Sequence, residues 1–223
     1  MSFLVLCPTR GRPDAARETL ASFQETRELS DTQLLFVVNA DEDQEIYRGM
    51  PVFVVPKQDW MNDVLRLVVE HILMVGPPDY LGFIGDDNRF RTPGWDQRVV
   101  EVLEDRGGGF AYGNDLGRFD IPSHVFVSSN IVKALGWFGL PGAHHLYLDN
   151  TWGHLGEGAD CLYFIPDLII EHLHPLFGKG EMDESYLSSS SHDVFAHDLL
   201  AYNSWLEKDA EKDIATVRDT IGT

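Results

Sequence analysis

The sequence predicts an α/β fold in which a mixed, mainly parallel sheet is flanked by helices and followed by a C-terminal helix. Short apolar runs recur along the chain and are near-continuous, as in strands covered on both faces. These runs alternate with segments of helical periodicity, which is the pattern of α/β domains. Polar residues gather where the runs end, at the edge where open α/β sheets bind ligands. The 223 residues, 43% of them hydrophobic, suffice for one domain with a substantial core.

The first ninety residues are expected to follow the order β-α-β-β-α-β. The first helix begins near Pro13, because proline is favoured in the first turn of a helix. Asp59 is expected to cap the second helix, and Gly76 with the two prolines after it ends that helix. The predicted strands are residues 3–7, 34–38, 52–55 and 80–84.

Beyond residue 90 the expected order of elements is less regular. Thr92 and Pro93 are expected to open a helix as its cap and first-turn proline. Residues 178–191 are polar and rich in glycine and serine, which predicts a loop, and the tail from residue 194 has helical spacing. The remaining predictions are strands at 110–112, 124–127, 161–165 and 168–174, and helices at 129–135 and 147–155.

The charge of the chain restricts the class of partner. A formal net charge of -19 opposes broad contact with nucleic-acid phosphates or anionic membranes. No apolar stretch approaches the roughly 20 residues of a membrane-spanning helix, and the N-terminus has the pattern of a strand and not of a signal peptide. We therefore expect a cytoplasmic protein without membrane contact. The densest cationic cluster, Arg10, Arg12 and Arg17, favours one small anionic ligand.

An acidic turn, Asp86-Asp87-Asn88, follows the fourth predicted strand. Two adjacent carboxylates at the end of a buried strand raise each other's proton affinity unless a cation lies between them. Their oxygen atoms suit Mg²⁺ or Mn²⁺. The alternative is a turn and cap without metal, for which Asp and Asn are equally typical.

Two later segments carry further candidate groups. His172 and His174 are two residues apart and so share one face of an extended segment, where either could complete a metal site. A histidine hydrogen-bonded in the core is the alternative. Asp149 lies at the start of a predicted helix, shortly before Trp152. It is either a helix cap or a general base for an incoming hydroxyl.

Together these features resemble the nucleotide-sugar glycosyltransferases of the Rossmann-like GT-A fold, especially their family 2-like members. The resemblance covers residues 3–186. It rests on the Pro8-Thr9-Arg10-Gly11-Arg12 loop, the acidic end of the second strand, the Asp-rich turn after the fourth, and the later Asp149 and histidines. It implies a single GT-A domain over residues 1–223. In this domain residues 1–90 would be the nucleotide-binding half, 91–186 the acceptor and catalytic half, and 187–223 a helical tail.

The resemblance also implies a role for each candidate. Asp87 would hold Mn²⁺ or Mg²⁺ together with Asp86 or Asn88, and His172 or His174 would complete the metal site. Asp149 would activate the acceptor hydroxyl. Residues 177–180 and their continuation to residue 186 are either a lid over the donor or a solvated connection. The residues expected around the donor, a UDP-sugar, are Pro8, Thr9, Arg10, Arg12, Asn39, Asp41, Asn62, Asp86 and Lys179.

Two positions depart from the family pattern. The family's metal motif is Asp-any-Asp, whereas residues 85–88 read Gly-Asp-Asp-Asn, so the register of the ligands stays open. The family's base usually follows another acid, whereas Leu148 precedes Asp149. Residues 85–96 are also similar to small bacteriophage glycosyltransferases. That similarity would place the protein in a host cytoplasm, with a modified phage DNA base, a protein or a glycan as acceptor.

The predicted function is the metal-dependent transfer of a sugar from a nucleotide-diphosphate donor to a hydroxyl acceptor, with inversion if Asp149 is the base. Two alternatives stay open. A sugar-phosphate nucleotidyltransferase shares the layout but usually has a longer glycine-rich loop with a lysine after the first strand, which residues 8–12 lack. A non-catalytic nucleotide-sugar-binding protein would bind the donor without turnover. The sequence leaves the oligomeric state open.

Overall fold

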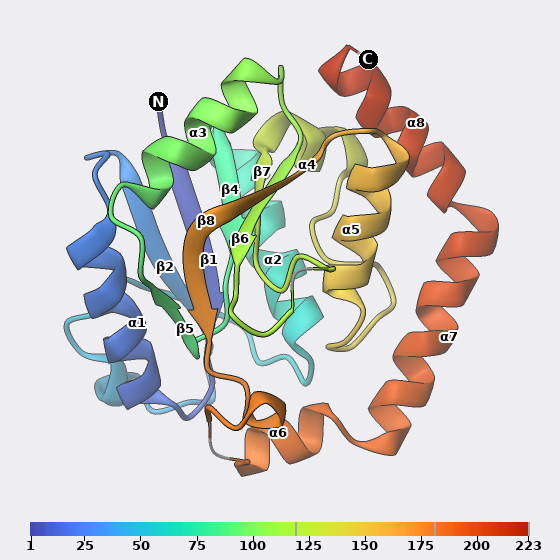
Figure 1. Cartoon of the computed structure of the whole chain (residues 1–223). Coiled ribbons are helices and arrows are strands. Elements are labelled where there is room, and N and C mark those ends of the chain that lie inside the picture. The colour runs from blue at the N-terminus through green and yellow to red at the C-terminus, as the bar shows by residue number, and fades with distance from the viewer. Residues whose placement is uncertain (119, 181, 223) are drawn as a thin grey trace.

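The computed structural model describes residues 1–118, 120–180 and 182–222, which form an eight-stranded sheet with helices on both faces (Figure 1). The strands are β1 (Phe3–Pro8), β2 (Thr32–Asn39), β3 (Val52–Val55), β4 (Tyr80–Phe83), β5 (Asn88–Phe90), β6 (Phe110–Asn114), β7 (Val125–Ser128) and β8 (Leu162–His172). The α-helices are α1 (Pro13–Thr26), α2 (Met61–Val75), α3 (Trp95–Asp105), α4 (Ser129–Leu135), α5 (Leu148–Gly158), α6 (Glu184–Ser189), α7 (His192–Lys208) and α8 (Ala210–Ile221). Short 3-10 helices span Gln44–Tyr47 and Pro175–Phe177.

The strands have the order β3-β2-β1-β4-β7-β6-β8-β5. β1 pairs in parallel with β2 and β4, and β2 pairs in parallel with β3. β7 is antiparallel to β4 and β6, and β5 is antiparallel to β8. The predicted mixed, mainly parallel α/β sheet is confirmed. This order places the C-terminal ends of β1, β2 and β4 next to one another, at one edge of the sheet.

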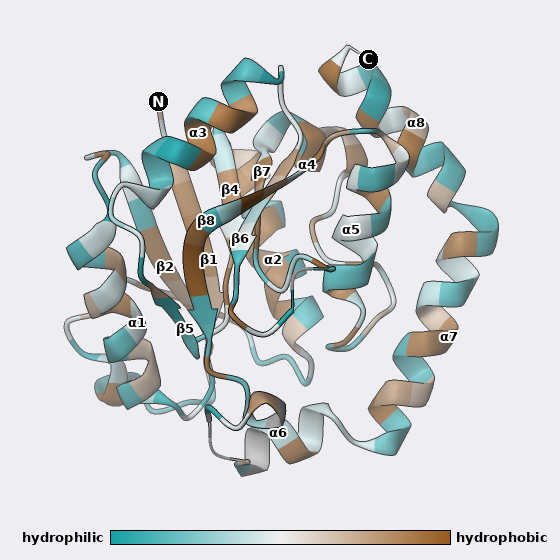
Figure 2. Ribbon diagram, viewed as in Figure 1, coloured by the Kyte–Doolittle hydropathy of each residue, from teal (hydrophilic) through white to brown (hydrophobic). Residues whose placement is uncertain are grey.

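The strands bury side chains on both faces, as their near-continuous apolar runs predict. Phe3, Val5 and Cys7 of β1 pack with α1 and α3 on one face. Leu6 points to the opposite face, where α2, α4, α5 and α8 contribute the core. Figure 2 shows the strands mostly brown and the outer sides of the helices largely teal. A sheet covered on both faces leaves its strand ends as the place where polar side chains gather.

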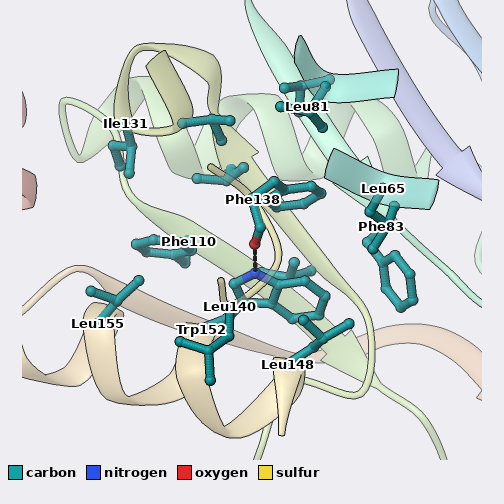
Figure 3. Close-up of a cluster of buried hydrophobic side chains, with 14 of the residues drawn as sticks. Leu65, Leu81, Phe83, Phe110, Ile131, Phe138, Leu140, Leu148, Trp152 and Leu155 are labelled. Carbon is teal, nitrogen blue, oxygen red and sulfur yellow. Dashed lines mark hydrogen bonds between the residues drawn. The ribbon is translucent and has the colours of Figure 1, made fainter. Parts of the chain in front are cut away.

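Trp152 anchors α5 against the sheet. Its side chain is 1% exposed and packs against Phe83 and Phe138. Its indole Nε1 donates a hydrogen bond to the carbonyl oxygen of Phe138 (2.7 Å; Figure 3). Truncation of such a buried aromatic side chain to alanine typically costs about 3–5 kcal/mol of stability. Because α5 also carries Asp149, this packing fixes the helix that forms one side of the candidate site.

Two predicted helix caps are wrong. α3 begins at Trp95 behind Gly94, whose φ of 67° only glycine adopts freely, and so Thr92 is not its cap. Thr92 Oγ1 instead accepts a hydrogen bond from the backbone N–H of Ile169 (2.8 Å), which ties this segment to β8. α2 begins at Met61 without a side-chain cap, and so Asp59 does not have the expected capping role.

The C-terminal third is more regular than the sequence predicts. The two late strands are one strand, β8, whose pairing with β6 shifts register between Gly113 and Asn114. The expected loop at 178–191 contains α6, and the tail forms two helices, α7 and α8. Cys7 and Cys161 are buried free thiols. Of the helices in the described ranges, none combines the length and apolar character that a membrane span requires.

Candidate active site

A cavity of about 880 Å³ opens at the edge of the sheet where β1, β2 and β4 end. The structure brings eleven of the predicted site residues to its wall, from segments that are far apart in the sequence. These are Pro8, Thr9, Arg10, Arg12, Asn39, Asp86, Asp87, Asn88, Asp149, His172 and His174.

The acidic turn connects β4 to β5 and is held by its own side chains and by α1. Asn88 Oδ1 accepts a hydrogen bond from the backbone N–H of Gly85 (2.7 Å), which closes the turn. The buried hydroxyl of Thr19 donates to the carbonyl oxygen of Asp86 (2.6 Å). A Cβ at Gly85 would collide with Asp87 Oδ1, so a larger residue there would displace that carboxylate. The Asn88 side chain therefore helps to fix the turn that presents the two carboxylates.

Strand register brings His172 to Asp87. β5 and β8 pair Asn88 with His172, and the N–H of Leu173 donates to the carbonyl oxygen of Asp87 (3.0 Å). His172 Nε2 consequently lies 3.2 Å from Asp87 Oδ2. Burial alone would raise the pKa of Asp87, but the bond to His172 lowers this pKa to about 2. Burial alone would lower the pKa of His172, but Asp87 raises it above its usual value. Asp87 thus stays charged, and it favours the protonated form of His172.

Asp86 is held from the loop after β1. Its Oδ2 accepts a hydrogen bond from Thr9 Oγ1 (2.7 Å), and Arg12 Nη1 lies 3.3 Å from its Oδ1. Burial and the nearby Asp87 raise the pKa of Asp86 to about 6, against the opposing effects of Thr9 and Arg12. The side chain of Thr9 therefore orients Asp86.

Residues 183–186 lie over the acidic turn. Arg12 Nε and Nη2 donate to the carboxylate of Asp183 (2.7 and 2.5 Å), and the guanidinium of Arg12 stacks 4.5 Å from the ring centroid of Tyr186. The Tyr186 hydroxyl donates to Asp87 Oδ2. His174 packs edge-on against His172 and Tyr186 (both 5.1 Å between ring centroids). This segment thus engages both Arg12 and Asp87, as a lid would.

Asp149 lies across the cavity in the first turn of α5. Its Oδ1 accepts a hydrogen bond from the backbone N–H of Asn150 (2.9 Å). Burial raises the pKa of Asp149 above its ordinary value. A carboxylate of raised pKa in a cavity has the property that a general base requires.

The side chains of two predicted donor ligands form hydrogen bonds with backbone groups. The amide of Asn39 makes a reciprocal pair with Gln58: Nδ2 donates to its carbonyl oxygen and Oδ1 accepts from its N–H (both 3.0 Å). Asn62 lies outside the cavity, where its Nδ2 donates to the carbonyl oxygens of Ala143 (3.0 Å) and Leu140. Each amide therefore orders a loop beside the cavity.

Asp41 and Lys179 also lie away from the cavity wall. Asp41 forms exposed ion pairs with Arg10 (3.6 Å) and Lys57 (3.7 Å). Lys179 Nζ lies 3.1 Å from Glu171 Oε1 and donates to the carbonyl oxygen of Leu116 (3.2 Å). Ion pairs with nearby residues account for both side chains.

The cavity wall also contains residues without a predicted role. Trp60 lines it and stacks on His144 (4.1 Å between ring centroids, 8° between planes). His145 and Tyr147 line it beside Asp149, and Tyr147 has a φ of 64°, which is uncommon outside glycine. The sequence signal for Trp60 is its position immediately before a helical run. No pattern in the sequence predicts the positive φ of Tyr147.

A second group of possible metal ligands lies near the cavity. His144, His197 and Asp198 bring their ligand atoms within 4.8 Å of one another. The two rings are stacked 3.6 Å apart at an angle of 4°. A metal ion lies in the plane of each imidazole that binds it, and two nearly parallel planes at this separation share no such point. Asp198 already accepts three backbone N–H bonds. This arrangement is a hydrogen-bonded stack.

Comparisons with known proteins define the fold. No protein-family model and no curated protein sequence matches the chain. Among solved structures, a mannosyltransferase from Pyrobaculum calidifontis in complex with GDP-Man and Mn²⁺ matches with a TM-score of 0.60 and 12% identity, over 98% of this chain and 73% of that one. S. aureus TarS in complex with UDP-GlcNAc matches with a TM-score of 0.62 and 12% identity, over 99% and 72% of the two chains.

A third match is glucosyl-3-phosphoglycerate synthase from Mycobacterium tuberculosis in complex with Mn²⁺, UDP-glucose and phosphoglyceric acid. Its TM-score is 0.61 at 14% identity, over 91% of this chain and 80% of that one. The chain therefore has the fold of the GT-A nucleotide-sugar glycosyltransferases. At these identities the likeness defines the fold, and the chemistry has to be argued from the cavity.

Proposed function

We propose that the protein is a metal-dependent glycosyltransferase that moves a sugar from a nucleoside-diphosphate donor, a UDP-sugar, to a hydroxyl acceptor. The observation that carries the proposal is the pair Asp87 and His172, placed beside Arg12 in a cavity at the strand ends and facing a carboxylate on α5. The glycosyltransferase fold and the nucleotide-sugars bound in the matching structures support it.

The donor set fits Mn²⁺ or Mg²⁺. Adjacent ligands at right angles around an ion with bonds of about 2.1 Å are roughly 3 Å apart. Asp87 Oδ2 and His172 Nε2 are 3.2 Å apart, and one carboxylate oxygen with one imidazole nitrogen suits a first-row divalent ion. Asp86 would contribute to the site through its charge. When bound, the ion would stabilise the negative charge that develops on the leaving diphosphate.

Arg12 is the principal residue for the donor diphosphate. Its guanidinium now makes a bidentate bond to Asp183, and a diphosphate offers oxygen atoms of the same geometry. Donor binding would therefore exchange Asp183 for phosphate oxygens and move residues 183–186. Pro8 and Arg10 line the same cavity. Closure of this segment over the bound donor would exclude water from the reacting centre.

Asp149 is the proposed base on the acceptor side. It would take the proton of the acceptor hydroxyl as the oxygen attacks the anomeric carbon. The new carbon–oxygen bond forms as the bond to the diphosphate breaks, and the nucleoside diphosphate leaves with the electron pair. Attack from the side opposite the leaving group inverts the anomeric configuration. Its raised pKa places Asp149 nearer neutrality than an ordinary aspartate.

Calorimetry and product analysis test this function together. UDP-sugars and GDP-sugars are titrated with and without Mn²⁺, and release of free nucleoside diphosphate is followed with glycan, protein and modified-DNA acceptors. We expect Mn²⁺-dependent donor binding and acceptor-dependent release. Donor binding without release across the acceptor panel would establish a non-catalytic binding protein. Formation of a nucleotide-sugar from a sugar phosphate and a nucleoside triphosphate would establish a nucleotidyltransferase.

A further inference from the structure

The carboxylate of Asp198, on α7, holds the loop that leads into α5, the helix that carries Asp149. Asp198 is 0% exposed, although its side chain is charged. Its two oxygens accept hydrogen bonds from three consecutive backbone N–H groups, those of His144 (2.7 Å), His145 (2.8 Å) and Leu146 (2.7 Å). Bonds from N–H groups to a buried carboxylate are among the stronger hydrogen bonds in proteins. The path of this loop is therefore set from α7.

Ring stacking extends the same contact to the cavity wall. His197, next to Asp198 on α7, donates Nδ1–H to Asp198 Oδ1 (3.0 Å), and its ring stacks on His144 at 3.6 Å. His144 in turn stacks on Trp60, which lines the cavity. On the opposite side, Asn62 bonds the carbonyl oxygen of Ala143. The loop is thus clamped between α2 and α7.

The clamped loop continues directly into Asp149. Residues 145–149 all line the cavity, and Leu146 precedes Asp149 by three positions. Between them Tyr147 has a φ of 64°, a conformation that an L-residue keeps only when its surroundings impose it. The three bonds to Asp198 end at the residue before Tyr147, and the Tyr147 ring stacks on Tyr202 of α7 (5.2 Å). The position of Asp149 therefore depends on contacts with α7, which lies outside α5 in Figure 1.

We propose that Asp198 is a positioning residue for the transfer reaction: it sets the orientation of Asp149 toward the acceptor hydroxyl without lining the cavity. The inference rests on the proposed function, in which Asp149 is the base. It makes α7, expected from the sequence to be a tail, part of the catalytic machinery. Donor binding depends on the opposite side of the cavity, and so it does not depend on Asp198.

The Asp198→Asn variant tests this role. Asparagine keeps the shape of the side chain but replaces one acceptor oxygen with an amino group, which cannot accept a backbone N–H. We expect kcat for transfer to fall about 10- to 100-fold, because small displacements of a catalytic group have effects of that size. We expect the donor Kd and KM to stay within twofold, and amide exchange in residues 140–149 to accelerate. Asp193→Asn, at an exposed position of the same helix, is the matched control.

A second variant, Asp198→Glu, keeps both oxygens on a longer side chain and should retain more kcat than Asp198→Asn. An unchanged kcat in Asp198→Asn, or unchanged exchange in residues 140–149, would overturn the inference. So would a loss of donor affinity in proportion to kcat, since that is the signature of general unfolding. If the wild-type protein binds no donor, the proposed function fails, and the exchange experiment still decides whether Asp198 holds the loop.

Discussion

The two sides of the cavity are built in different ways. On the sheet side, backbone pairing brings His172 to Asp87, since β5 and β8 align Asn88 with His172. On the helical side, residues 145–149 are placed by side chains from distant elements, above all Asp198. A position set by strand register tolerates changes in neighbouring side chains, whereas a position set by one buried carboxylate depends on that carboxylate. Substitutions on the two sides should therefore separate donor binding from turnover.

The largest effect on donor binding is expected from Asp87→Ala on the sheet side. The variant removes the carboxylate that pairs with His172, and we expect Mn²⁺-dependent donor affinity to fall by about 100-fold or more, because even outer-shell metal partners are worth 10- to 100-fold. Isothermal titration with and without Mn²⁺ measures the loss, and circular dichroism confirms the fold. Asp14→Ala, on an exposed part of α1, is the control. Retention of wild-type Mn²⁺-dependent donor affinity would show that Asp87 does not bind the metal.

Asp149→Asn should separate turnover from binding. The amide keeps an oxygen for the N–H of Asn150 but cannot take a proton, so we expect transfer to fall by about 10²- to 10⁴-fold. The donor Kd should stay within twofold. Single-turnover assays and titration of the same preparation measure both quantities. Near-normal turnover would show that another group is the base. Donor binding and turnover would then not be separated between the two sides of the cavity.

The pH dependence of kcat distinguishes the two sides further. Asp149 acts as a base only in its charged form, and burial raises its pKa. Transfer at saturating donor should therefore fall as pH decreases through this raised pKa, at a higher pH than for an ordinary aspartate of pKa about 3.9. The residual activity of the Asp149→Asn variant should not show this fall at low pH. A midpoint at or below the ordinary value would contradict the assignment.

The sheet side could be predicted from the sequence because its information is local. An apolar run followed by Asp86-Asp87-Asn88 marks a strand end, and two histidines at a spacing of two mark one face of a second strand. The sequence does not show which strands are neighbours. The pairing of β5 with β8 brings His172 to Asp87, and the Asn88 side chain closes the turn through the N–H of Gly85.

The helical side could be predicted only in part, because its contacts join residues far apart in the chain. Asp149 is recognisable as an acid at a helix start, but nothing near it indicates Asp198, 49 positions later. Asn39 and Asn62 have the same limitation: an amide near a strand end or helix start suggests a ligand, and only the structure shows the backbone groups that it bonds. The division into functional halves at residue 90 stays a prediction.

Gly85→Ala tests the acidic turn on the sheet side by adding a Cβ to its backbone. The added Cβ would collide with Asp87 Oδ1 and turn the carboxylate away from its place, so we expect about a tenfold loss of Mn²⁺-dependent donor affinity. Gly153→Ala on α5 is the matched change on the helical side, where the nearest atom, Pro122 Cδ, is 3.4 Å from the new Cβ. Donor affinity there should be unchanged. Equal losses of donor affinity in both variants would mean that an added Cβ disturbs the turn no more than it disturbs α5.

The smallest effect is expected where residues 183–186 meet the sheet side. Tyr186→Phe removes the hydroxyl that donates to Asp87 Oδ2 but keeps the ring beside Arg12. If that hydroxyl competes with the metal, Mn²⁺ affinity should rise about fivefold, the equivalent of roughly 1 kcal/mol for one net hydrogen bond. Tyr80→Phe, at the opposite end of β4, is the control. A fall in Mn²⁺ affinity would instead make the hydroxyl part of the metal site. The closed position of residues 183–186 would then be the donor-binding state, and not a state that donor binding must open.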